Sequence, residues 1–221
     1  MTTKPGSPPR ARPDKQSKPD DALARIINRA RSRSPTIRAK AVMALRCRGP
    51  RAVTVLIGAL SDKRLALGER LFTDGWHPIG LLSSDSLYCI GAPAIPALVK
   101  ALKDPRAQVR LYSARALRRM TDTIGRKRDQ ALRVRALIGA SYDAAPLVRA
   151  EAIGWISLRK DVVARQVALL TDPDPRVRAV AADQVAFIVQ NPNLARSVAK
   201  AALQALAPRR SIADFSRPDT C

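Results

Sequence analysis

The sequence predicts an all-α protein, a right-handed α-solenoid of about five to six stacked helical hairpins. Composition is the first indication: hydrophobic residues make up 46% of the 221 residues and aromatic residues only 4%, so alanine and aliphatic side chains must fill the core. Small side chains let neighbouring helices pack closely, whereas strands favour aromatic and β-branched residues. The second indication is internal repetition, which is the sequence signature of repeat architectures.

Each repeat is anchored by a Val-Arg or Ile-Arg pair at the start of a helix. The pairs are Ile37-Arg38, Val109-Arg110, Val148-Arg149 and Val177-Arg178. After each pair, core-type residues recur at helical spacing and trace one face of a helix. After Val109 these residues are Tyr112, Ser113, Ala116, Leu117 and Met120.

A second apolar helix and a turn precede the anchored helix. In the clearest unit, residues 94–102 lead into a Lys-Asp-Pro turn and then into the Val109 helix. Pro96 fits the first helical turn, where its missing N–H costs nothing, and Pro105 separates the two helices. Residues 167–175, which end in Asp-Pro-Asp-Pro, repeat this arrangement.

These residues resemble a known repeat family. The run from Ile90 to Leu98, with Asp104-Pro105 and Val109-Arg110, is similar to the HEAT-like repeat that also occurs in phycobilisome lyases, and residues 172–178 are a second match. The resemblance covers residues 21–206 and implies a fold more than a function, because many activities share such solenoids. It also implies that the second helices line a concave surface. Finally, it implies that turn aspartates pair with the anchor arginines as a structural ladder; the available partners are Asp104, Asp143, Asp172 and Asp174.

We expect one repeat domain over residues 21–206, between two Pro-rich, charged tails at 1–20 and 207–221 that are expected to be disordered. Its predicted parts are a hairpin of helices near 21–33 and 36–47, an irregular unit that begins at 51–60, units over about 92–120, 128–159 and 161–190, and a capping helix at 194–206.

The repeat pattern is lost in an insertion at residues 61–83. Residues 62–71 are compatible with a helix, whereas 72–82 are expected to form a loop because they contain two glycines and a proline. A short helix is expected to resume over 84–90.

The predicted loop carries two aromatic residues and the single histidine of the chain, which are Phe72, Trp76 and His77. Insertions into solenoids often fall on a binding face, and an apolar loop with a tryptophan can anchor a partner. The alternative is that the loop covers a gap in the stack.

The charge of the protein favours anionic partners. The formal net charge is +22, and the two tails account for +3 (residues 1–20) and +1 (residues 207–221), which leaves +18 in the repeat domain. Such a surface favours nucleic acid, anionic lipid or an acidic protein face.

Basic side chains away from the core are the candidate binding residues of the concave surface. They are Arg46, Arg48, Arg115, Arg118, Arg119 and Arg159. Together they form either a cationic binding strip or a solvated face.

The sequence offers little material for catalysis, and we expect no catalytic residue, metal or cofactor. One histidine and two glutamates, Glu69 and Glu151, cannot build the di-iron site of HEAT-repeat hydroxylases, and the cysteines and His77 lack the spacing of a zinc site. Three scattered cysteines (Cys47, Cys89 and Cys221) argue against a disulfide framework. With no apolar run of about 20 residues and no secretory signal, a cytoplasmic monomer is expected.

Two functions remain open at this point. The first is a non-catalytic scaffold or adaptor that binds an acidic protein partner in the groove. The second is a nucleic-acid-binding protein that uses the same groove, as HEAT-like alkylation-repair DNA glycosylases do, although Trp155 and Asp183 do not reproduce their aromatic and acidic constellation. A bilin-lyase-like or chaperone role is a further alternative suggested by the resemblance.

Overall fold

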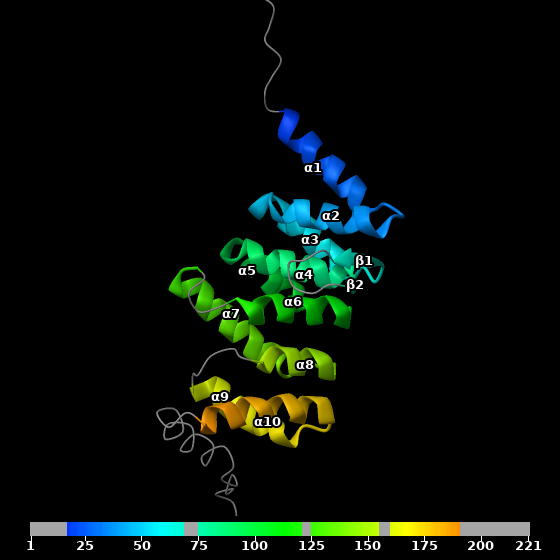
Figure 1. The fold of residues 1–221 in the computed structure, drawn as a ribbon. Coiled ribbons are helices and arrows are strands. Elements are labelled where there is room, and N and C mark those ends of the chain that lie inside the picture. The colour runs from blue at the N-terminus through cyan, green and yellow to red at the C-terminus, as the bar shows by residue number, and fades with distance from the viewer. Residues whose placement is uncertain (1–16, 69–74, 121–124, 155–159, 191–221) are drawn as a thin grey trace, which may run out of the picture.

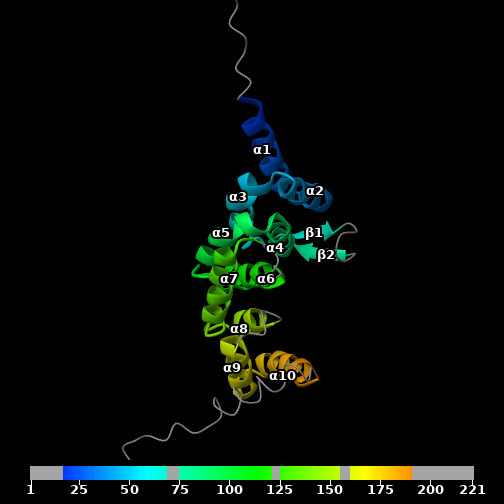
Figure 2. The ribbon, with the colours of Figure 1, turned by 90° about the vertical axis from the view of Figure 1, so that its left-hand side faces the viewer.

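The computed structural model describes residues 17–68, 75–120, 125–154 and 160–190, and their helices stack as successive hairpins (Figure 1). The first helices of the hairpins are α1 (Ser17–Ala30), α3 (Val53–Ala59), α5 (Ile95–Ala101), α7 (Lys127–Ala140) and α9 (Lys160–Ala168). The second helices are α2 (Pro35–Arg46), α4 (Ile79–Ile90), α6 (Ala107–Arg119), α8 (Pro146–Ile153) and α10 (Pro175–Val189). The second helices form one column and α3, α5, α7 and α9 form the other (Figure 2). The expected α-solenoid is thereby confirmed.

Proline and glycine set several helix boundaries. Pro35, Pro146 and Pro175 occupy the first turn of α2, α8 and α10, where a missing N–H costs nothing. Gly91 ends α4 with φ 76°, a left-handed conformation that glycine adopts without strain. Short 3₁₀ turns precede α3 (Gly49–Ala52) and α5 (Ala92–Ala94), and a third follows α9 (Leu169–Thr171).

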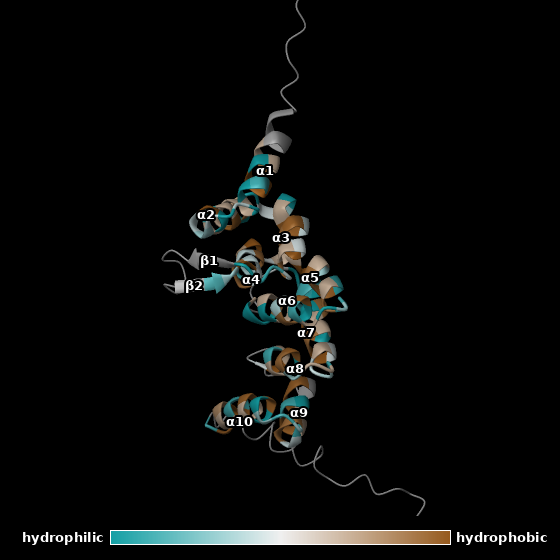
Figure 3. Ribbon diagram, turned by 90° about the vertical axis from the view of Figure 1, so that its right-hand side faces the viewer, coloured by the Kyte–Doolittle hydropathy of each residue, from teal (hydrophilic) through white to brown (hydrophobic). Residues whose placement is uncertain are grey.

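The core lies between the two columns, and hydrophobic stripes on the helices turn toward it (Figure 3). Val109, Val148 and Val177 are each at most 1% exposed, as the repeat pattern predicts, whereas Ile37 in the first hairpin is 38% exposed. One continuous apolar cluster extends from Ala39 to Val162, and two smaller clusters hold the last described hairpin.

The insertion differs from the prediction. Residues 62–71 are compatible with a helix and 72–82 were expected to form a loop. Instead, β1 (Leu65–Gly68) and β2 (Gly75–Pro78) pair as an antiparallel hairpin, with Ala66 opposite His77. Strand pairing joins segments that are apart in the sequence, so a local helical pattern does not reveal it. The helix α4 then starts at Ile79, five residues before the predicted Ser84. The hairpin stands on the side of the second helices (Figures 2 and 3).

The insertion lengthens the turn between α3 and α4 and leaves the repeat intact. The buried residues Ile79, Ser83 and Leu87 of α4 match Val109, Ser113 and Leu117 of α6 in spacing. The first N–H groups of α4 donate to the carbonyls of Arg64 and Asp62, at 2.9 and 3.0 Å, so the segment that leads into the hairpin caps this helix. Gly80 therefore stands where the other repeats have their anchor arginine.

Several expectations fall on other parts of the chain. The predicted capping helix at 194–206 and the C-terminal tail lie outside the described residues, as do Phe72, Trp155 and Arg159. At the other end α1 begins at Ser17, inside the segment expected to be disordered.

Candidate binding surfaces

The anchor arginines hold the turns of the stack together. Arg110 donates through Nη1 to the carbonyls of Asp104 and Pro105 in its own turn, both at 2.9 Å. Its Nε and Nη2 form a fork on the carboxylate of Asp143 in the next turn, at 2.6 and 2.9 Å. A single side chain therefore ties two consecutive turns together.

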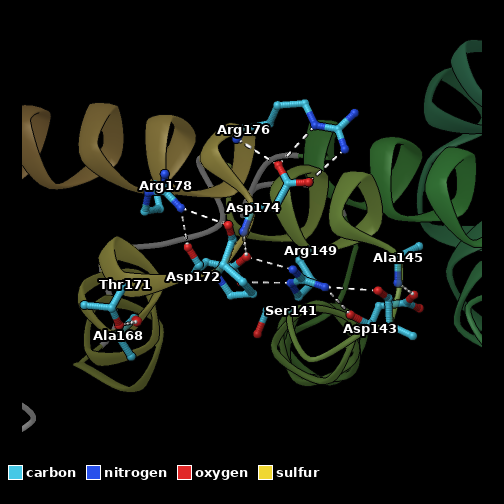
Figure 4. Close-up of polar contacts among 12 residues, drawn as sticks. Ser141, Asp143, Ala145, Arg149, Ala168, Thr171, Asp172, Asp174, Arg176 and Arg178 are labelled. Carbon is cyan, nitrogen blue, oxygen red and sulfur yellow. Dashed lines mark hydrogen bonds and ion pairs between the residues drawn. The ribbon is translucent and has the colours of Figure 1, made fainter.

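Arg149 repeats this geometry one step further along (Figure 4). Its Nη1 donates to the carbonyls of Asp143 and Ala144, and its fork lies on Asp172 at 2.9 and 2.7 Å. Arg178 likewise donates Nη1 to the carbonyls of its own turn, at 2.8 and 3.0 Å. The ladder that the resemblance implies is present, and each fork reaches the aspartate of the following repeat.

Gly80 changes the ladder at the joint between the second and third hairpins. With no arginine there, Asp104 accepts instead from the backbone N–H and guanidinium of Arg106, two residues on. Arg106 also donates to the hydroxyl of Ser61 in the preceding turn at 3.1 Å. A hydrogen bond between exposed groups therefore replaces the buried fork.

The ladder also shifts the pKa values of its carboxylates. Burial raises the pKa of Asp143, but hydrogen bonds from Arg110 and from the Ala145 N–H outweigh burial, so the net pKa is lowered. For Asp172, the hydrogen bonds from Arg149 are the largest cause of a lowered pKa. The local pair with Arg106 lowers the pKa of Asp104 to about 2. These carboxylates are ionised at neutral pH and accept hydrogen bonds that hold the turns of the stack.

Three of the candidate arginines lie together on α6, held by carboxylates of neighbouring helices. Arg119 pairs with Asp85 of α4 and lies over the Tyr88 ring at 4.8 Å, and Arg115 is 3.7 Å from the same carboxylate. Arg118 donates to Glu151 of α8 at 2.8 Å and passes close to Gly154, where a larger residue would clash with it. The side chains of Arg115, Arg118 and Arg119 remain 32%, 23% and 23% exposed. The sequence identified these arginines but not their carboxylate partners.

The other candidate residues are distributed differently. Arg46 of α2 is half-buried and donates to the Cys89 thiol at 3.7 Å, and Arg48 is exposed beyond the end of the same helix. His77 is partly buried in β2, next to Trp76 in the chain. We refer to Lys40, Arg46, Asp85, Arg115, Arg118, Arg119, Glu151 and Asp183 as the second-helix strip.

The described residues contain no cluster of three or more His, Cys, Asp or Glu side chains that could hold a metal ion. Among the helices in the described ranges, none combines the length and the apolarity needed to cross a bilayer.

The stacked hairpins define this chain as a helical repeat protein, and comparison with known proteins finds one HEAT repeat in it. The HEAT repeat family model matches residues 94–124, which span α5 and α6. The complex of CpcE and CpcF of phycocyanin lyase from Nostoc sp. PCC7120 is similar at 20% identity and a TM-score of 0.46, over 93% of this chain and 80% of that chain. A designed armadillo repeat protein is similar at 16% identity and a TM-score of 0.42, over 86% of this chain and 94% of that one. The sequence matches none of the curated proteins compared with it.

Proposed function

We propose that this protein is a non-catalytic HEAT-repeat scaffold that binds an elongated, net acidic protein segment along the second-helix strip. A stack of repeats presents an extended surface without long-range contacts along the chain, which suits an elongated partner. The observation that carries the proposal is the row of partly exposed arginines on α6, which lie beside the carboxylates of Asp85 and Glu151.

The pairing with carboxylates prepares these arginines for binding. A guanidinium has five N–H donors, and Glu151 takes only the Nε and Nη2 directions of Arg118, which leaves further donors for a ligand. Because the side chain is already ordered, less conformational entropy is lost when a partner binds.

The strip also favours a polypeptide over a phosphate backbone. It alternates donors with acceptors, because Asp85 and Glu151 lie among the arginines and Asp183 is exposed on α10. A polypeptide offers both N–H donors and carboxylates, whereas phosphodiester oxygens only accept hydrogen bonds and are repelled by the carboxylates of the strip. Five cations against three carboxylates give the strip a net charge of 5 − 3 = +2, so a net acidic segment fits best.

The test is binding of fluorescent acidic peptides, measured by anisotropy, with peptides of the same length in which Gln and Asn replace Glu and Asp. The double substitution Arg115→Gln with Arg118→Gln is expected to weaken acidic-peptide binding by about tenfold or more, because a hydrogen bond to a charged group contributes about 1.5–3 kcal/mol.

The matched control is Arg126→Gln with Arg128→Gln, which removes the same charge from the other column of helices and is expected to leave the affinity nearly unchanged. Equal binding of acidic and neutral peptides, or an equal loss in both variants, would refute the proposal. Circular dichroism of both variants establishes that the helices are retained.

A further inference from the structure

A second positively charged surface lies on the other column of helices. Exposed cations project from α5 and α7, the first helices of the third and fourth hairpins, and from the turns beside α3, α5 and α7. They are Arg51, Lys100, Lys103, Arg126, Lys127, Arg128 and Arg135, and we call them the first-helix face. None of them forms an ion pair with a carboxylate of the described residues.

Helical spacing directs these cations outward. On α7, Arg128, Leu132 and Arg135 are exposed, whereas Val134 and Leu137 are buried, as expected for the two sides of one helix. On α5 the exposed positions are Pro96 and Lys100, which are also one turn apart. Since α5 packs against both α3 and α7, the three helices lie in one column (Figure 2). The exposed cations of α5 and α7, and Arg51 in the turn before α3, belong to this column.

Almost no negative charge offsets this face. In the segments 49–59, 92–103 and 126–140, Asp129 is the one acidic residue, and its carboxylate accepts the backbone N–H of Arg126 at 3.1 Å. The exposed charge of the face is therefore 7 − 1 = +6, against +2 on the second-helix strip. Of these two surfaces, the one with the larger net charge is the one that the sequence did not single out.

Small residues occupy several outward positions between these cations. Gly58 of α3 and Gly139 of α7 lie at outward positions, and a Cβ at either would meet no other atom within 4 Å. Ala131 is also exposed on α7. Small outward residues let a bulky backbone approach closely while long Arg and Lys side chains reach around it.

We propose that the first-helix face binds the phosphate backbone of duplex nucleic acid. Four of its seven cations are arginines, whose planar fork matches phosphate oxygens. The chemistry of the face disfavours the alternatives. Leu132, at 38% exposure, is the one large exposed apolar side chain described on α3, α5 and α7, whereas a helix that lies on a membrane buries an apolar face. The face also lacks the carboxylate acceptors that suit the second-helix strip to a polypeptide, because Asp129 is the one acidic residue of its segments.

This inference goes beyond the scaffold function proposed above. With a protein segment on the second helices and nucleic acid on the first helices, the chain would connect the two classes of partner through opposite columns of one stack. Acidic-peptide binding tests the second-helix strip, and DNA binding tests the first-helix face.

The test is a salt titration of binding to random-sequence duplex DNA, with the full chain and with the variant Arg51→Gln, Lys100→Gln, Arg128→Gln, Arg135→Gln. Four phosphate contacts contribute a slope of about −3.6 to log Kobs against log salt concentration, at about −0.9 for each contact. The variant is expected to lose this much slope and to bind at least tenfold more weakly at low salt.

The matched control removes four charges from the other column: Lys40→Gln, Arg46→Gln, Arg115→Gln and Arg118→Gln. It is expected to keep the slope of the unmodified chain, whereas the first-helix variant is expected to keep its affinity for acidic peptides. An equal loss of slope in both variants, no DNA binding at low salt, or binding to anionic phosphatidylserine vesicles without binding to DNA would each overturn the proposal. Separate peptide and DNA readouts distinguish its failure from failure of the scaffold function.

Discussion

Replacing Arg149 with alanine tests whether the ladder couples neighbouring repeats. The change removes the fork on Asp172, at 2.9 and 2.7 Å, and the donation to the carbonyl of Asp143 at 2.9 Å. Both partners of the fork are poorly accessible to solvent, with side chains 12% and 5% exposed. Breaking a buried ion pair costs about 3–5 kcal/mol, because it leaves an uncompensated charge in the interior. Asp172 keeps the N–H of Asp174 at 2.9 Å, so we expect the lower end, about 3 kcal/mol.

The same replacement at Arg106 is the matched control. Its side chain is 57% exposed, and pairs of this kind contribute about 0–1 kcal/mol. Urea unfolding followed by circular dichroism gives the global free energies, and hydrogen exchange of α8 and α10 gives the local effect, since repeat proteins can unfold in parts.

A double-mutant cycle isolates the pair itself. Arg149→Ala with Asp172→Ala is expected to cost less than the sum of the single substitutions, by about 1.5–3 kcal/mol. Equal costs for Arg149→Ala and Arg106→Ala, or an additive cycle, would show that the ladder geometry does not carry this stability.

Three further predictions follow from individual residues. Gly80→Ala is expected to destabilise the fold by about 1–3 kcal/mol in urea unfolding, because the added methyl group would overlap the Leu60 carbonyl oxygen and approach the Tyr112 ring to 2.7 Å; an unchanged midpoint would contradict this. Gly139→Ala is expected to stabilise it by about 0.5–1 kcal/mol, since the space is open and alanine favours helix, and a lower stability would count against an outward position. The lowered pKa of Asp172 contributes stability above its unfolded pKa of about 3.9, which is lost as pH falls through the folded value. An Asp172→Asn variant is therefore expected to lose less stability below pH ~4, and parallel acid profiles would refute this.

The sequence was sufficient for the stack because its main signals are local. Val109, Leu117 and Met120 lie at helical spacing, and the structure buries all three. Turn chemistry such as that of Pro105 is equally local, so helix and turn positions followed from neighbouring residues alone.

Contacts between repeats were not predictable in the same way. Four aspartates were available to the anchor arginines, and only the stacking of turns selects Asp143 for Arg110 and Asp172 for Arg149. The strand pair of the insertion depends on contacts between distant segments, and its short strands contain glycine and proline, which argue against strands locally. The basic strip was predicted from unpaired charges, while the structure brings Asp85 and Glu151 to it from other helices. Residue types and their spacing are sufficient to predict the helices. The net charge on each column of helices can be predicted only once the fold shows which residues lie together.

The one-sided position of the ladder has a mechanical consequence. The forks from Arg110 and Arg149 join consecutive turns along a single edge of the stack, where short hydrogen bonds resist stretching. That edge therefore acts as an inextensible spine, and the low-energy deformation is a rotation of one hairpin against the next about it. At Gly80 the spine lacks its buried fork, so rotation there meets less resistance. We expect larger rotations between the second and third hairpins than at the two joints that the forks of Arg110 and Arg149 connect.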